Sequence, residues 1–322
     1  MNASAYAQLY YDDQGNKTPC LLGDAGMKVT VGESDVYSTT CDPSYALNGG
    51  ITDHVGPDQA MAFVVPFGSK QTAISHDAAY EVFGLGGNGL TTIPWTNPSR
   101  FYIRSKTTGT QQMIAQEIGV PADRFLGVDQ HTASNVDLGL AGLSPSEAEE
   151  AIGILSVSVY DQDRPNVRAL AYRRSNQSCA YLPDSTLDSF DKANVRDGHY
   201  PIFGPLHFFT SATTTSTEAQ QLGASASLGI VAFFAAETVN PLVLDVFIEA
   251  GLVPRCAMTV TQTENKELGT LAPYTPTKSC ACYFLAKTNS PLPPECAPCT
   301  PKTAATDCPA SRPCNDGFCE LR

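Results

Sequence analysis

The chain has 322 residues, of which 42% are hydrophobic and 16% charged, a composition typical of globular rather than disordered proteins. Its formal net charge is −13 and it contains no run rich in Lys or Arg, so we expect neither a nucleic-acid partner nor attachment to anionic lipid. No apolar stretch approaches the roughly 20 residues that a membrane-spanning helix needs.

Strands and helices are predicted to alternate along the first 255 residues. Apolar runs of strand length occur at 28–31, 62–66, 101–104 and 151–157. Helical patterns occur at 75–83, 107–118 and 240–250. Ser75 can cap the first of these helices, while Gly119 and Gly251 can end the other two. The alternation predicts an α/β fold, and uninterrupted apolar runs predict a mostly parallel sheet.

The segment from Arg104 to Thr110 combines several features of an oxyanion site. A predicted strand ends at Arg104, and Thr108, Gly109 and Thr110 open the next helix. The first turn of a helix has unpaired backbone N–H groups, glycine lets a ligand approach closely, and the hydroxyls and the guanidinium add donors. The pattern predicts a cradle for a tetrahedral oxyanion. The alternative is a capped helix beside a surface Arg.

Several segments, taken in order, resemble the phosphate-binding solute receptors of ABC transporters, which have the type II periplasmic binding fold. The matching segments are Gly32-Glu33-Ser34-Asp35, Phe63-Val64-Val65-Pro66, Trp95-Thr96-Asn97-Pro98, Arg104 to Thr110, and Tyr200-Pro201-Ile202. The fourth resembles the family's Arg and Ser-Gly-Thr anion loop, with Thr108 in place of Ser, and the second and fifth resemble its crossings between lobes. The resemblance covers about residues 25–255.

This resemblance implies a two-lobed binding protein rather than an enzyme. Lobe 1 would be residues 1–63 and 200–255, lobe 2 residues 64–199, and a Cys-rich tail would follow at 256–322. Inorganic phosphate or a similar oxyanion would bind between the lobes of a periplasmic or extracellular monomer, without a cofactor, for uptake through an ABC permease or for sensing.

The ligand-binding residues implied by the resemblance are Ser34, Asp35, Arg104, Thr108, Gly109 and Thr110. Asp35 would accept a hydrogen bond from a proton on phosphate. Fully ionised sulfate has no such proton, so a buried Asp35 would discriminate against it. Without the resemblance, a strand-end or N-cap role would be the favoured interpretation of Asp35.

The family's first donor loops have no match before Asp35, where residues 5–20 read as an apolar strand and a turn. An alternative function is therefore a secreted adhesion or structural protein that keeps the fold and binds no small molecule. A secreted hydrolase is a third possibility, but no nucleophile and base are recognisable together. Because residues 1–19 show no signal peptide, we also expect the chain to be an N-terminally shortened form of an exported protein.

The 11 cysteines indicate an oxidising compartment. Seven lie between Cys280 and Cys319, in a Pro-rich region with few large apolar residues, so this tail is expected to depend on disulfides. Bonds within 256–322 are expected because short loops close at small entropic cost. Zinc is the alternative for Cys296-x-x-Cys299, although no His follows His207.

Overall fold

The computed structural model describes residues 7–11, 17–21, 31–41, 50–88, 92–211, 241–264, 266–309 and 312–320. At its centre is a seven-stranded sheet with the order β3-β11-β4-β8-β6-β7, and β9 also pairs with β4. The strands are β3 (Val31–Ser34), β4 (Ile51–Pro66), β6 (Phe101–Ile103), β7 (Val128–Asp129), β8 (Ile152–Ser156), β9 (Val167–Ala169) and β11 (Phe203–Ser211).

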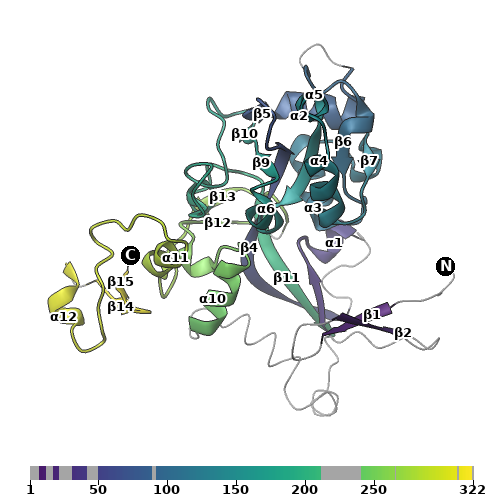
Figure 1. The fold of residues 1–322 in the computed structure, drawn as a ribbon. Helices are drawn as coiled ribbons and strands as arrows, with labels where there is room; N and C mark the ends of the chain where they lie inside the picture. The colour runs from purple at the N-terminus through teal and green to yellow at the C-terminus, as the bar shows by residue number, and fades with distance from the viewer. Residues whose placement is uncertain are drawn as a thin grey trace.

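The 16-residue strand β4 runs through the middle of this sheet (Figure 1). It connects the part formed with β3 and β11 to the part formed with β6, β7, β8 and β9. It pairs with β11 along residues 51–60, then with β8 and β9 along residues 61–66. The chain therefore passes through the predicted crossing at 63–66 without leaving the strand. The predicted return crossing lies beside it, because the Tyr200 hydroxyl donates to the Met61 carbonyl at 2.6 Å and the Met61 amide donates to the Ile202 carbonyl at 2.9 Å.

The strand directions are mixed, so the prediction of a mostly parallel sheet is wrong. β4 is antiparallel to β8, β9 and β11, and β11 is antiparallel to β3. β6 is parallel to β7 and β8. The apolar run at 62–66 is continuous because both of its faces are buried, and burial on both faces does not fix strand direction.

Five helices gather around β6, β7 and β8 in the upper part of the molecule (Figure 1). They are α2 (His76–Leu85), α3 (Gly109–Ile118), α4 (Ala133–Ala141), α5 (Pro145–Glu150) and α6 (Val157–Asp163). The predicted caps are present: the Ser75 hydroxyl accepts the Ala78 amide at 3.2 Å, and Gly119 ends α3 with φ 69°. The buried ring of Phe83 on α2 stacks on Phe63 of β4 and contacts Phe101 of β6 edge-on.

The remaining elements are short. They are β1 (Ala7–Tyr11), β2 (Lys17–Leu21), α1 (Ser38–Cys41), β5 (Ala73–Ser75), the 3-10 helices Pro98–Arg100, Ala122–Arg124 and Arg255–Ala257, β10 (Ala171–Arg173), α7 (Ala193–Arg196), α10 (Pro241–Glu249), β12 (Val260–Gln262), β13 (Leu271–Pro273), α11 (Ala281–Lys287), α12 (Ala304–Asp307), β14 (Cys314–Asn315) and β15 (Phe318–Cys319). β1 and β2 pair antiparallel, so the strand predicted near the N-terminus is present, while the turn after it lies outside the described residues.

Four disulfides hold the C-terminal region, which lies to one side of the sheet (Figure 1). They are Cys256–Cys280, Cys282–Cys296, Cys299–Cys314 and Cys308–Cys319. The first belongs to the main core, whereas Cys299, Cys308 and Cys319 form a small separate cluster. The predicted α/β class, the Cys-rich tail and the local pairing of its cysteines are therefore confirmed.

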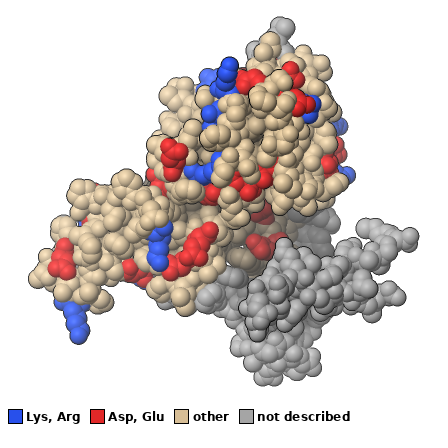
Figure 2. All heavy atoms as spheres, in the orientation of Figure 1, with Lys and Arg blue, Asp and Glu red and all other residues tan. Residues whose placement is uncertain are grey.

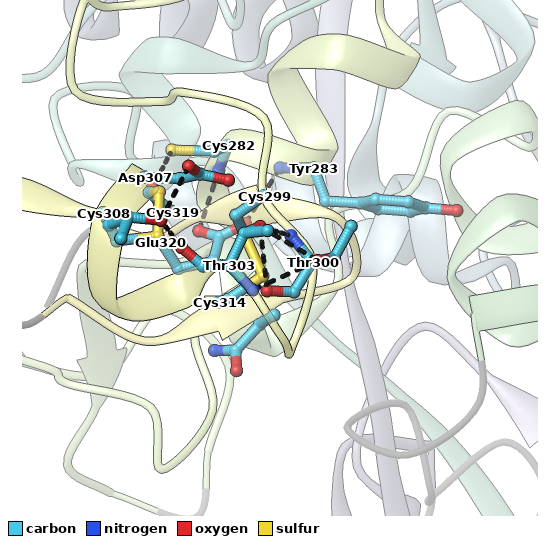
Figure 3. The surroundings of a disulfide bond; sticks show 12 residues. Cys282, Tyr283, Cys299, Thr300, Thr303, Asp307, Cys308, Cys314, Cys319 and Glu320 are labelled. Atoms are coloured by element: carbon cyan, nitrogen blue, oxygen red, sulfur yellow. Dashed lines mark hydrogen bonds between the residues drawn. A yellow bond between two sulfur atoms is a disulfide. The ribbon is translucent and has the colours of Figure 1, made fainter.

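A buried carboxylate attaches the end of the tail to the start of α11. Glu320 is fully buried, and its side chain lies against Cys282 and Tyr283 (Figure 3). It accepts the backbone N–H groups of these two residues at 2.9 Å each, and the Ser279 hydroxyl at 3.1 Å. These amides belong to the first helical turn and have no partner within the helix, so Glu320 caps α11 with its own negative charge.

Thiol counting on denatured, unreduced protein should find at most three free thiols. Of the 11 cysteines, eight are bonded, and the exposed Cys179 is free. Cys20 and Cys41 are the other two. Peptide mapping without reduction should recover the four bonded pairs. Four or more free thiols would contradict this framework.

Acidic and basic side chains are interspersed on the face shown in Figure 2, and the coloured part of that face carries no broad basic surface. The lower left part of the molecule, where the tail lies, carries both acidic and basic side chains separated by uncharged surface. Within the described ranges, no helix combines the length and apolar character that crossing a bilayer would require.

Candidate functional site

The later residues of the predicted anion site lie where β6 meets α3. They are Arg104, Thr108, Gly109 and Thr110. β6 is fully buried and carries the chain to Arg104, and α3 begins at Gly109 after a turn closed by the Thr108 amide donating to the Ser105 carbonyl at 2.9 Å. The Arg104 amide donates to the Gln111 side chain at 3.0 Å, which fixes the strand end against the helix. The first turn of α3 thus presents its N–H groups at the carboxyl end of β6.

Asp35, one of the two earlier residues of the predicted site, contacts the start of α3. Asp35 follows β3 and lies against Gly109, so closely that a Cβ at position 109 would be 2.3 Å from the Asp35 Cβ and 2.4 Å from its Oδ2. Only glycine can occupy this position without displacing Asp35. Two segments that are distant in the sequence therefore meet at the start of α3.

The surroundings of Asp35 act on its pKa in opposite directions. Burial and the nearby Glu33 raise the pKa of Asp35, while Arg104 and His207 lower it, and the pKa that results is about 6. Burial lowers the pKa of Arg104, and the carboxylates of Asp35 and Asp129 act in the opposite direction. Asp35 can therefore hold a proton close to neutral pH beside a guanidinium group.

A second cluster of polar residues lies next to Arg104 and consists of Ser105, Asp129 and His131. The Arg104 Nε donates to the His131 carbonyl at 3.3 Å, and the Ser105 hydroxyl donates to both oxygens of Asp129 at 3.0 Å. His131 Nδ1 lies 3.2 Å from the Ser105 oxygen and 3.3 Å from the nearer oxygen of Asp129. One ring nitrogen therefore faces both the hydroxyl and the carboxylate. A serine–histidine–aspartate relay needs opposite ring nitrogens, so this group does not have that geometry.

The hydroxyls of the other predicted residues have local roles. The Ser34 oxygen accepts the Val36 amide at 3.1 Å. The Thr108 hydroxyl donates to the Ser105 carbonyl at 2.9 Å and caps α3 by accepting from Gln111. Thr110 is buried, with 3% of its surface exposed. The structure thus brings Asp35, Gly109 and Arg104 together, while Ser34 and Thr108 stabilise the turns that hold them.

Two nearby residues had no predicted role. Asp129 ends β7, the parallel neighbour of β6, so the rule that carboxyl ends of parallel strands share one edge could have identified it. His207 lies in β11 beside Ser34 of β3 and is fully buried. Its Nδ1 is 2.8 Å from an oxygen of Asp53, and its Nε2 has no hydrogen-bond partner in the described part of the chain. A lone His in an otherwise apolar strand was the available signal.

One cluster of potential metal ligands occurs among the described residues. The sulfur atoms of Cys299, Cys308 and Cys319 lie within 4.8 Å of one another. All three are in disulfides, whereas zinc binds thiolates, so the arrangement favours the disulfide interpretation over zinc.

No protein-family model matches the chain, and no curated protein matches it. Among solved structures, the chain is similar to a DING protein, with 15% identity and a TM-score of 0.49 over 72% of this chain and 78% of that one. It is also similar to a phosphate-binding protein from Stenotrophomonas maltophilia, with 12% identity and a TM-score of 0.45 over 71% of this chain and 77% of that one.

A third similar structure is an ABC-type phosphate transport receptor from Vibrio cholerae, with 14% identity and a TM-score of 0.44 over 70% of this chain and 79% of that one. Phosphate-binding proteins, the family that the sequence motifs resemble, are thus among the solved structures to which this chain is similar.

Proposed function

We propose that this chain is a binding protein for inorganic phosphate or a closely similar oxyanion, and not an enzyme. The observation that supports the proposal most strongly is the contact between Asp35 and Gly109 at the first turn of α3. This contact places a carboxyl group that can hold a proton next to the first turn of α3 and near the Arg104 guanidinium. A protonated oxyanion could donate to Asp35 while accepting from Arg104 and α3.

The proposed organisation follows from the two crossings. Lobe 1 is residues 1–63 and 200–255, lobe 2 is residues 64–199, and the tail is residues 256–322. The crossings lie side by side at Met61, Tyr200 and Ile202, where a hinge could open the site. Four disulfides favour a periplasmic or extracellular location. An ABC permease is the proposed partner of the monomer, for uptake or sensing.

A second candidate function is a secreted structural or adhesion protein without a small ligand. Two observations favour it. The Asp35 carboxylate itself lies against the helix start, where an anion would bind, and the Thr108 hydroxyl is already engaged by the Ser105 carbonyl. In this interpretation Asp35 takes the place of the ligand and stabilises the junction between the segments.

Anion titration with thermal unfolding separates these functions. Phosphate at 100 times its Kd should stabilise the wild-type fold by about 2.7 kcal/mol, and sulfate should stabilise it much less. In Asp35→Asn the difference between the two anions should shrink, because an amide can donate to sulfate where a carboxylate cannot. If no oxyanion stabilises the wild type, the structural function is favoured. If sulfate and phosphate stabilise it equally, Asp35 does not have the proposed role.

A further inference from the structure

Glu267 is a buried carboxylate in the turn between β12 and β13, with only 5% of its surface exposed. Among the residues that the structure describes, its partners are neutral donors. Oε1 accepts the backbone N–H of Tyr37, and Oε2 accepts the Thr40 hydroxyl at 2.6 Å and the Gln116 side-chain amide at 3.3 Å. The neighbouring cations have other partners, since Lys266 pairs with Glu264 and Arg174 pairs with Glu117.

These donors come from both halves of the candidate site. Tyr37 and Thr40 belong to the short segment that follows Asp35, and Thr40 lies within α1. Gln116 lies on α3, whose first turn contains Gly109. A single carboxylate therefore links the Asp35 segment to the helix against which Asp35 lies.

The hairpin that carries Glu267 is itself anchored. Near its start, the Thr259 amide donates to the Arg196 carbonyl at 2.9 Å, and the Gln262 side chain donates to the Phe203 carbonyl at 2.9 Å. Gly198 lies beneath the hairpin, where a Cβ would be 2.8 Å from Leu271. The hairpin is thus fixed to the return crossing at residues 196–203, and its turn reaches α1 and α3 from that base.

We propose that Glu267 is a positioning residue of the anion site, which holds the Asp35 segment on α3 and keeps the site closed. The inference rests on the proposed function and adds to it a role for the C-terminal region. Without the carboxylate, the Tyr37 amide and the Thr40 hydroxyl lose their acceptor, and the Asp35 segment loses its link to α3. Buried donors without partners are costly, so the segment moves toward water and away from Gly109.

The test compares Glu267→Ala, Glu267→Gln and Glu267→Asp with the wild type in two measurements. Calorimetry with inorganic phosphate should show binding about tenfold weaker or worse in Glu267→Ala, within the range of typical coupling between sites. Glu267→Gln keeps the size of the side chain but offers one acceptor oxygen in place of two, so it should weaken binding less. Glu267→Asp should recover part of the loss. Lys266→Ala, in the same turn but exposed, is the matched control and should bind as the wild type does.

The second measurement needs no ligand. NMR titration of the Asp35 carboxyl should give a midpoint near 6 in the wild type and a lower one in Glu267→Ala and Glu267→Gln, because Asp35 becomes hydrated. The charged neighbours of Asp35, namely Glu33, Arg104 and His207, are the same in all variants. A merely structural role would lower the melting temperature without moving this midpoint.

The two measurements separate the possible failures. If the wild type binds no phosphate but the Asp35 midpoint falls in the variants, the proposed function fails and Glu267 still positions Asp35. If the wild type binds phosphate and Glu267→Gln changes neither the affinity nor the midpoint, the role of Glu267 is overturned. Glu267→Gln decides the matter even if Glu267→Ala does not fold.

Discussion

Replacing Arg104 with alanine should weaken phosphate binding by about 2–5 kcal/mol, roughly 30- to 4,000-fold. Arg104 lowers the pKa of Asp35 more than His207 does, and its side chain is partly buried at the carboxyl end of β6. Without it, an anion beside α3 would face the carboxylates of Asp35 and Asp129, which also act on Arg104, with no guanidinium between them. Binding an anion next to two carboxylates without a compensating cation costs far more free energy than the loss of one hydrogen bond.

Isothermal calorimetry of folded variants is the measurement. Arg124→Ala, which removes an exposed arginine from the 3-10 helix Ala122–Arg124, is the matched control and should bind phosphate as the wild type does. Arg104→Lys should fall between the two, because it keeps the charge but loses the forked donor geometry. An Arg104→Ala protein with unchanged affinity would exclude Arg104 from the site.

The parts of the fold that could be predicted from the sequence are those encoded by local chemistry. Ser75 and Thr108 cap α2 and α3, and Gly119 takes the left-handed conformation that ends α3. Each signal depends on residues within one helical turn, so no knowledge of the tertiary structure is needed to find it. The C-terminal disulfides follow the same logic, because their short loops favour local pairing.

Strand direction could not be predicted, because it depends on partners that are distant in the sequence. The run at 62–66 is buried on both faces whichever way its neighbours point, and in the structure they are antiparallel β8 and β9. The length of β4 was missed for a related reason. Its first five residues are partly buried or exposed without a regular alternation and the rest are buried, so only the apolar run at its end gives a clear signal.

The positions of Asp35 and Gly109 in their own elements could be predicted from the sequence, but the contact between them could not. The sequence indicates Asp35 at a strand end and Gly109 at a helix start, and only the fold shows that the glycine makes room for the aspartate. Glu267 could not have been predicted as part of the site. It reaches α1 and α3 from a hairpin that is anchored to the return crossing, and nothing near it in the sequence suggests that geometry.

Asp35→Asn should stabilise the unliganded protein near pH 7.5 by about 1–3 kcal/mol, and the gain should vanish near pH 4. The pKa of Asp35 is about 6 in the folded protein and near 3.9 in an unfolded chain. Between these values the folded state binds more protons than the unfolded state, so the contribution of Asp35 to stability falls as pH rises from about 4 to above 6. At higher pH the buried charge opposes folding in full, and an uncharged amide removes that cost.

The measurement is chemical denaturation of the wild type and Asp35→Asn at several pH values without added anion. The difference in the free energy of unfolding between the two proteins, plotted against pH, reports Asp35 alone. Asp58, whose pKa is also raised to about 6 mainly by burial, is present in both proteins and cancels. Asp123→Asn, which removes a carboxylate at an exposed position, is the control and should change the free energy of unfolding only slightly. Saturating phosphate should reverse the order at pH 7.5, since the ligand stabilises the wild type more than the variant. If the two unliganded curves stay parallel from pH 4 to pH 8, Asp35 is not buried against α3 in solution, and the contact on which the proposed site depends is wrong.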